Sequence, residues 1–256
     1  MSRNLNQIEI ETDGPYKHPT FDNSTCSTDG QITVYFRDLL PALLKYIRQA
    51  DVVTGCVAWL THPEIISALA KCNRGAAIVV QKEDFLRPDT HANDKWKSTL
   101  HSAYQSIGNR LCRSSFPHLS NLSVCGDPTL HGVRCVGNHN RDRDPAFPRM
   151  HNKFLVFWKL FTSTNDEPID LEEDPSSPDF DQNLEPEKQE IYRPYAVWTG
   201  SFNLTKNATL SLENALYVLD PIIVGAYAEE WRQITSISEP LNWTSDWCAP
   251  EWRIGT

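Results

Sequence analysis

The sequence predicts an α/β domain in which a mixed β-sheet is flanked by helices on both faces. Apolar residues recur at helical spacing over residues 39–50, and a continuous apolar run rich in β-branched residues follows over 51–60. A second helical pattern at 62–75 is followed by another apolar run at 76–82. This alternation of helices and strands is typical of a sheet covered by helices. The length of 256 residues is enough for one large domain of this kind.

The remainder of the chain continues the pattern. Pro63 suits the first turn of the helix at 62–75, and Gly75 suits its C-terminal end. The periodicity predicts two more helices and five more strands, the helices over 96–112 and 224–235 and the strands over 122–127, 132–137, 154–158, 195–200 and 212–219.

The chain divides into three parts by composition. Residues 1–30 form a polar lead-in, 31–240 form the main domain, and 241–256 form a Trp-rich C-terminal cap. The tryptophans of this cap either pack against the domain or form a stacking surface, and the packed cap is the preferred interpretation.

The net charge of −9 has a local origin. Segment 161–190 holds eleven Asp or Glu residues and one Lys, so its own net charge is −10 and the remaining residues sum to +1. Four prolines and few large apolar side chains predict that this segment is a solvated loop inserted into the domain. The acidic composition therefore does not exclude a nucleic-acid partner.

The cysteine pattern predicts a reducing environment. Seven cysteines occur at irregular spacing, and the chain has neither a secretory signal nor an apolar run long enough to span a membrane. We therefore expect a cytoplasmic protein without disulfides. Six residues are candidate zinc ligands: Cys112, His118, Cys125, His131, Cys135 and His139. Because no C-x2-C pair occurs among them, buried thiols are preferred to a zinc site, and no metal or other cofactor is expected.

Two groups of polar residues lie next to the ends of predicted strands. His151 and Lys153 stand two apart before an apolar run, so both project from the same side of an extended segment. Ser201 and Asn203 follow the strand predicted at 195–200, and Glu213 comes later in the chain. Lys, Ser and Asn side chains donate hydrogen bonds to phosphate oxygens. A Glu can orient an imidazole ring by accepting its second N–H.

These residues resemble the motif of the phospholipase D superfamily, which is H-x-K followed by G-S-x-N and often by a Glu. The match falls on His151, Lys153, Gly200, Ser201, Asn203 and Glu213, and a looser similarity extends over residues 31–235. The resemblance implies an α-β-α sandwich and metal-independent hydrolysis of a phosphodiester. At a position where the family usually has an Asp, this chain has Trp158, a difference that bears on local geometry and leaves the catalytic set complete.

The resemblance also implies a mechanism and an assembly. His151 attacks phosphorus to form a covalent phosphohistidine, and Lys153, Ser201 and Asn203 stabilise charge on the non-bridging oxygens. A second His protonates the leaving oxygen and then activates water. The family needs two motifs in one active site, whereas this chain has one. The resemblance therefore implies a homodimer in which two His151 side chains face each other across the two-fold axis.

The preferred substrate is nucleic acid, either DNA or RNA. Four arginines lie in the basic stretch that leads to the motif: Arg134, Arg141, Arg143 and Arg149. This stretch is either a solvated loop with internal Arg–Asp pairs or a guide for the phosphate backbone. The alternatives are a phospholipase or phospholipid synthase of the same superfamily, for which no membrane-binding stripe is evident, and a non-catalytic interaction module.

The acidic segment 161–190 has two interpretations under this hypothesis. It either solubilises the chain, or it competes with nucleic acid for the basic stretch and so restrains the nuclease. The sequence specifies no regulatory protein partner.

Overall fold

The computed structural model describes residues 4–7, 23–87, 95–117, 119, 128–144, 147–162, 190–247 and 249. Nine strands form one mixed sheet in the order β1-β2-β10-β9-β8-β3-β4-β7-β11, and β5 and β6 form a separate pair. The strands are β1 (Ser24–Cys26), β2 (Ile32–Phe36), β3 (Val52–Val57), β4 (Gly75–Gln81), β5 (Leu111–Cys112), β6 (Thr129–Leu130), β7 (Val133–Val136), β8 (Lys153–Thr162), β9 (Glu190–Gly200), β10 (Asn214–Val218) and β11 (Glu239–Pro240). The α-helices are α1 (Leu39–Gln49), α2 (Pro63–Ala70), α3 (Lys95–Ile107) and α5 (Pro221–Ser236). β3, β4 and β7 run parallel, and every other neighbouring pair is antiparallel.

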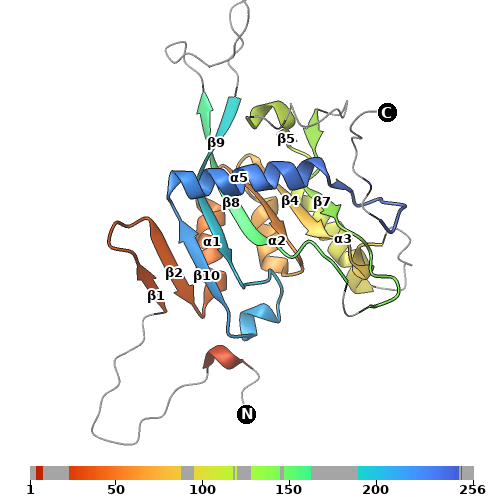
Figure 1. Cartoon of the computed structure of the whole chain (residues 1–256), viewed down its shortest axis with the longest axis horizontal. Helices are drawn as coiled ribbons and strands as arrows, with labels where there is room; N and C mark the ends of the chain where they lie inside the picture. The colour runs from red at the N-terminus through yellow and green to blue at the C-terminus, as the bar shows by residue number, and fades with distance from the viewer. Residues whose placement is uncertain are drawn as a thin grey trace, which may run out of the picture.

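Helices cover both faces of the large sheet. The apolar residues of α1, α2 and α3 pack against one face, and those of α5 pack against the other. Figure 1 shows α5 in front of the sheet and the other three helices behind it. Strands β3, β4 and the first half of β8 are buried on both faces, because each side of the sheet carries a helical layer. The predicted fold class, a mixed sheet with helices on both faces, is confirmed.

Trp158 is part of the core on the α5 face. It is fully buried against Phe116 and Trp231, and its Nε1 donates a hydrogen bond to Oγ1 of Thr54 at 2.8 Å. It pairs with Val52 at the beginning of β3. A bulky residue here therefore fills the space between the sheet and α5.

Two helix ends differ from the prediction. Gly75 does not end a helix but begins β4 with φ +140°, and a Cβ there would lie 3.2 Å from the Leu111 side chain. Helix α3 ends at Ile107, earlier than expected, because Gly108 adopts φ +73° and the chain then enters β5. The strand predicted over 122–127 lies outside the described residues. The other predicted helices and strands are present, with β8 and β9 longer than expected.

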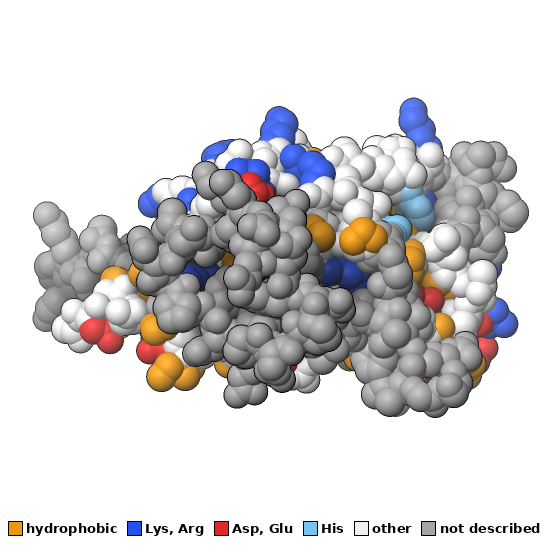
Figure 2. Space-filling view, turned by 90° about the horizontal axis from the view of Figure 1, so that it is seen from above, with side chains coloured by type: hydrophobic (Ala, Val, Ile, Leu, Met, Phe, Trp, Pro, Cys, Tyr) orange, Lys and Arg blue, Asp and Glu red, His pale blue; other side chains and the backbone are white. Residues whose placement is uncertain are grey.

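The acidic segment joins the long hairpin formed by β8 and β9. The hairpin extends the predicted strands to Thr162 and Glu190, which are paired with each other. This end of the hairpin lies at the top of Figure 1. Figure 2 shows the molecule from that side, with Lys and Arg side chains along the upper margin of the view. Glu190 forms a 3.3 Å ion pair with Arg74. The acidic segment is thus attached to the strand ends where β8 finishes and β9 begins.

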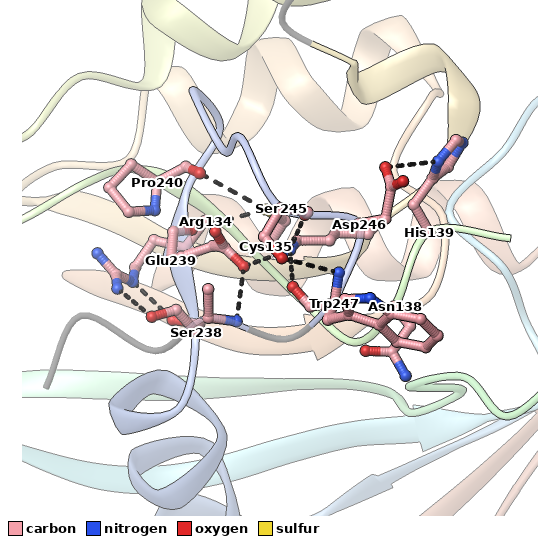
Figure 3. A network of polar contacts seen from close by, with 12 residues as sticks. Arg134, Cys135, Asn138, His139, Ser238, Glu239, Pro240, Ser245, Asp246 and Trp247 are labelled. Atoms are coloured by element: carbon pink, nitrogen blue, oxygen red, sulfur yellow. Dashed lines mark hydrogen bonds and ion pairs between the residues drawn. The ribbon is translucent and has the colours of Figure 1, made fainter. Parts of the chain in front are cut away.

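The part of the chain after α5 folds over β7 and the end of β4 (Figure 3). Lys82, which follows β4, is fully buried in an ion pair with Glu239, and its Nζ also donates to the carbonyl oxygens of Ser245 at 3.0 Å and Trp247 at 2.7 Å. The ring of Trp243 packs on the same ammonium group, with Nζ 5.0 Å from its centroid. Trp243 is buried whereas Trp247 is 68% exposed, so the two tryptophans have different roles.

At the other terminus, the sheet includes a strand within the polar lead-in. β1 pairs with β2 in antiparallel register, with Thr25 opposite Val34. Residues 24–26 therefore belong to the edge of the same sheet.

Candidate active site

The residues of the motif lie together at one end of the central strands of the sheet. β3, β4 and β7 end there, and because β8 is antiparallel to β3, it begins there with Lys153 opposite Val57. β9 is antiparallel to β8 and ends there as well with Gly200, which pairs with Ala215 near the beginning of β10. The H-x-K and G-S-x-N halves of the motif thus come from neighbouring strands, although the acidic segment separates them in sequence.

His151 and Lys153 are in direct contact. Nζ of Lys153 donates to the carbonyl oxygen of His151 at 3.0 Å and lies 3.2 Å from Nδ1 and 3.4 Å from Nε2 of its ring. Partial loss of hydration lowers the pKa of His151, and the charges of Lys153 and Arg149 lower it further. Loss of hydration also lowers the pKa of Lys153, while the nearby Glu213 opposes this change. The imidazole is therefore biased toward the neutral form that can act as a nucleophile.

The second half of the motif is organised around Ser201. Its hydroxyl donates to the carboxylate of Glu213 and accepts the backbone N–H of Asn214 at 3.1 Å. The backbone N–H of Ser201 in turn donates to the carbonyl oxygen of Asn214 at 3.1 Å. Gly200 is required before this turn because its φ is +158° and a Cβ would lie 2.3 Å from the same carbonyl oxygen. Among the described residues, Glu213 has no hydrogen bond to His151, which differs from the expected arrangement.

Asn203 lies where this turn meets the segment after β3. The carbonyl oxygen of Leu204 accepts the N–H groups of Thr61 and His62 at 2.9 Å each. The side-chain oxygen of Asn203 is buried and lacks a hydrogen-bond partner within the described part of the chain. This residue of the motif therefore has a polar atom that no described residue uses.

Gln81 holds the backbone just before His151, and sequence reasoning missed it. Its Oε1 accepts the N–H of Met150 at 2.7 Å, while its Nε2 donates to the carbonyl oxygens of Lys82 and Asn138 at 2.9 Å each. The side chain is 1% exposed, and a Cβ at Gly137 would lie 2.5 Å from its Oε1. A polar residue at the end of an otherwise apolar strand was the available signal.

Three of the four predicted arginines lie together beside the motif. Arg141, Arg143 and Arg149 line a hollow of about 470 Å³, which Arg87, His139, Asn140 and three acidic residues (Glu83, Asp84 and Asp144) also line. Arg141 is ion-paired with Asp246 at 2.5 Å. Arg143 and Arg149 have no ion pair or hydrogen bond to another side chain in the described ranges.

Arg134 is not part of this hollow. It is 1% exposed on β7, the strand next to β11 at the side of the sheet, and its guanidinium donates to Oγ of Ser238 at 2.6 Å and to the carbonyl oxygen of Ser238 at 2.7 Å (Figure 3). These bonds join β7 to the segment after α5. The prediction that Arg134 guides phosphate is wrong, because both faces of β7 are covered and all four of its residues are buried.

The candidate zinc ligands do not form a cluster in the described residues. No group of three His, Cys, Asp or Glu side chains is suitably placed for a metal there, while His118 and Cys125 lie outside the described ranges. Cys135 is buried in β7, and His139 lies 3.4 Å from Asp246 (Figure 3). The five described cysteines have free thiols, and burial raises the pKa of Cys56.

The chain is similar to several known proteins in sequence or in fold. No protein-family model matches the chain. Two similar solved structures are the phospholipase D family member Nuc from Salmonella typhimurium (18% identity, 79% of this chain and 92% of that chain, TM-score 0.41) and NucT from Helicobacter pylori (13% identity, 82% and 98%, TM-score 0.43).

A curated relative is more similar in sequence. "Uncharacterized protein L381" of Acanthamoeba polyphaga mimivirus is 33% identical over 226 residues, which cover 85% of this chain and 70% of that protein. The chain belongs to the same family as mimivirus protein L381. In the residues that the structure describes, every helix is too short or too polar to cross a membrane.

Proposed function

We propose that the protein is a phosphodiesterase that cleaves nucleic acid. The observation that carries the proposal is that Lys153 begins β8, with His151 two residues before it, where β9 ends and the segment joining Ser201 to Glu213 follows. A nucleophile with a lowered pKa, an ammonium group and a polar turn thus meet at one exposed site. This combination is suited to attack on phosphorus with stabilisation of the charged oxygens.

The proposed reaction has two steps. A ring nitrogen of His151 attacks phosphorus, the bond to the leaving oxygen breaks, and a protonated histidine gives its proton to that oxygen. The same histidine then removes a proton from water, which attacks phosphorus and breaks the P–N bond. Lys153 and Asn203 stabilise the non-bridging oxygens, and Ser201 holds the turn through its bond to Glu213.

The second histidine is proposed to come from another copy of the chain. The motif occurs once in the sequence, so a homodimer that brings two His151 rings to one phosphate supplies both the nucleophile and the acid. In this arrangement the two histidines have different protonation states during each turnover. The motif lies at exposed strand ends, which a second copy of the chain can reach.

The hollow beside His151 favours nucleic acid over lipid. Neither Arg143 nor Arg149 is paired with an acidic side chain in the described residues, so both side chains are available to bind backbone phosphates. A polynucleotide carries further phosphates on each side of the cleaved bond, whereas a phospholipid does not. Three acidic residues on the rim reduce the local positive charge, so contacts are expected from individual arginines rather than from a broad basic field.

The test is a substrate comparison with the purified protein in EDTA. Labelled single- and double-stranded DNA and RNA are incubated in parallel with phosphatidylglycerol vesicles, and products are resolved by electrophoresis and mass spectrometry. We expect cleavage of at least one nucleic acid and none by His151→Asn. Cleavage of lipid alone would support the phospholipase alternative, and no cleavage by a folded dimer would support an interaction module.

A further inference from the structure

Trp59 contacts the imidazole of His151 from the neighbouring strand. Trp59 follows β3, whose last residue pairs with Lys153. The ring centroids of Trp59 and His151 are 5.6 Å apart and their planes meet at 80°, which is an edge-to-face contact. The backbone N–H of Ala58 donates to the carbonyl oxygen of Asn152 at 2.9 Å. The segment that bears the indole is therefore fixed to the segment that bears the nucleophile.

A second strand holds the indole in place. Nε1 of Trp59 donates a hydrogen bond to Oε1 of Glu83 at 3.1 Å, and Glu83 lies just beyond the end of β4. A half-buried indole whose only polar atom is bonded is restricted to one orientation. The surface that Trp59 presents to His151 is thus set by two neighbouring strands.

We propose that Trp59, held by Glu83, is a positioning residue that fixes the orientation of the His151 ring for attack on phosphorus. Its catalytic consequence rests on the function proposed above, whereas the ring contact itself does not. The sequence predicted that the carboxylate of Glu213 could orient this imidazole, but in the structure that carboxylate accepts the hydroxyl hydrogen of Ser201 instead. Because Glu213 has no hydrogen bond to the imidazole, we assign the orienting role to the edge-to-face contact with Trp59.

The same contact affects the protonation of His151. The charged groups around the ring are Lys153 and Arg149 from its own segment, Glu213 beside Lys153, and Glu83 behind the indole. Loss of hydration is the leading cause of the lowered pKa of His151, and the indole is one of the groups that exclude water from the ring. Removal of the indole is therefore expected to raise this pKa, even though the charges remain.

The experiment compares matched variants in the full-length protein. Trp59→Ala removes the indole, and Trp59→Phe keeps an aromatic face but loses the bond to Glu83. Glu83→Leu removes the acceptor, whereas Glu83→Gln keeps an oxygen that accepts the indole N–H. Trp96→Ala removes an exposed tryptophan that packs on Phe85, so it controls for the loss of an indole elsewhere. The ring pKa of His151 is measured by NMR titration of labelled histidine, assigned with His151→Asn, and kcat and KM are measured across pH.

We expect Trp59→Ala to raise the His151 pKa, to move the acidic limb of the pH–rate profile upward and to lower kcat by about 10- to 100-fold with little change in KM. Trp59→Phe keeps the pKa closer to that of the unmodified protein, and Glu83→Gln loses less activity than Glu83→Leu. An unchanged His151 pKa and kcat in folded Trp59→Ala, as in Trp96→Ala, would overturn the proposal. If Trp59→Ala does not fold, equal kcat values in Glu83→Leu and Glu83→Gln would overturn it.

Failure of the proposed function gives a different result. If the unmodified protein cleaves no phosphodiester, the NMR titration still decides whether Trp59 controls the state of the His151 ring. If the protein cleaves nucleic acid but none of the Trp59 and Glu83 variants differs from Trp96→Ala, the function stands and the positioning role is rejected.

Discussion

The hydroxyl group of Ser201 donates its hydrogen bond to the carboxylate of Glu213. A serine hydroxyl has one hydrogen to donate, so in this arrangement it is not a donor to a phosphate oxygen. Lys153 instead has the free capacity for that role, because an ammonium group has three donors and one of them reaches the carbonyl oxygen of His151 at 3.0 Å. The relationship between Ser201 and Glu213 therefore assigns different roles to two residues of the same motif.

Substitution of these residues is expected to have unequal effects. Lys153→Met removes the charge that we propose stabilises the phosphate oxygens, so we expect kcat/KM to fall by about 100- to 1,000-fold. Ser201→Ala leaves Lys153 in place and weakens the turn, so we expect a loss of less than about tenfold. Steady-state kinetics on one oligonucleotide compare the two variants. Equal losses would mean that Ser201 binds phosphate directly.

The charge of Arg149 is expected to set part of the pH dependence. Arg149 lowers the pKa of His151, so Arg149→Gln raises that pKa and moves the acidic limb of the pH–rate profile to higher pH. Activity is then lost below the new pKa, because the protonated ring cannot attack. Arg143→Gln is the matched control, since Arg143 lines the same hollow without being a cause of the His151 shift. A shift of equal size in both variants would contradict this assignment.

The buried pair of Lys82 and Glu239 is expected to anchor the C-terminal segment. Lys82→Met leaves the Glu239 carboxylate buried without its cation, so we expect the free energy of unfolding to fall by about 3–5 kcal/mol. Lys97→Met breaks an ion pair to the exposed Asp84 and should cost at most about 1 kcal/mol. Urea denaturation of both variants measures the difference. Similar costs would show that the buried pair contributes no more than a surface pair.

Deletion of residues 163–188 is expected to leave the reaction unchanged. The deletion leaves Gln189 between the paired residues Thr162 and Glu190, and one Gly inserted before it closes the hairpin with a two-residue Gly-Gln loop, which suits a type II′ turn. Thr162 lies at the opposite end of β8 from Lys153, roughly 30 Å away at the rise of a β-strand. That distance exceeds the screening length at physiological salt, so the attachment points do not favour competition at the motif. A faster reaction or tighter binding at low salt after deletion would support the restraint hypothesis instead.

The sequence predicted most of the elements because their apolar patterns are strong. The helices at 39–50 and 224–235 and the buried strands at 51–60 and 76–82 have side chains that pack on the sheet, and the structure has an element at each position. The ends of the helices were harder to predict, because Gly75 and Gly108 are both glycines, the residue type that commonly follows a helix C-terminus. Only the tertiary structure distinguishes them, since Gly108 ends α3 and Gly75 packs against Leu111 as β4 begins.

The site was predictable only where residues lie close in sequence. The spacing of His151 and Lys153 identified them as a pair, and the structure places them in contact. Trp59 reaches the same segment from just after β3, and a single residue in that place carries no distinguishing pattern. Gln81, the last residue of β4, differed from its neighbours only in being polar at the end of an apolar strand. Arg134 was misassigned because it was grouped with the arginines that follow it at 141–149, whereas it lies in a strand whose two faces are both buried.

The most direct test of the account is detection of a covalent intermediate on His151. The protein is mixed in EDTA with an oligonucleotide labelled with ³²P at internal phosphates, quenched in denaturant and digested, and labelled peptides are sequenced. The account predicts a base-stable, acid-labile label on the peptide that contains His151, and no label in His151→Asn. Nucleic-acid cleavage that requires Mg²⁺ and leaves no label on His151 would contradict it.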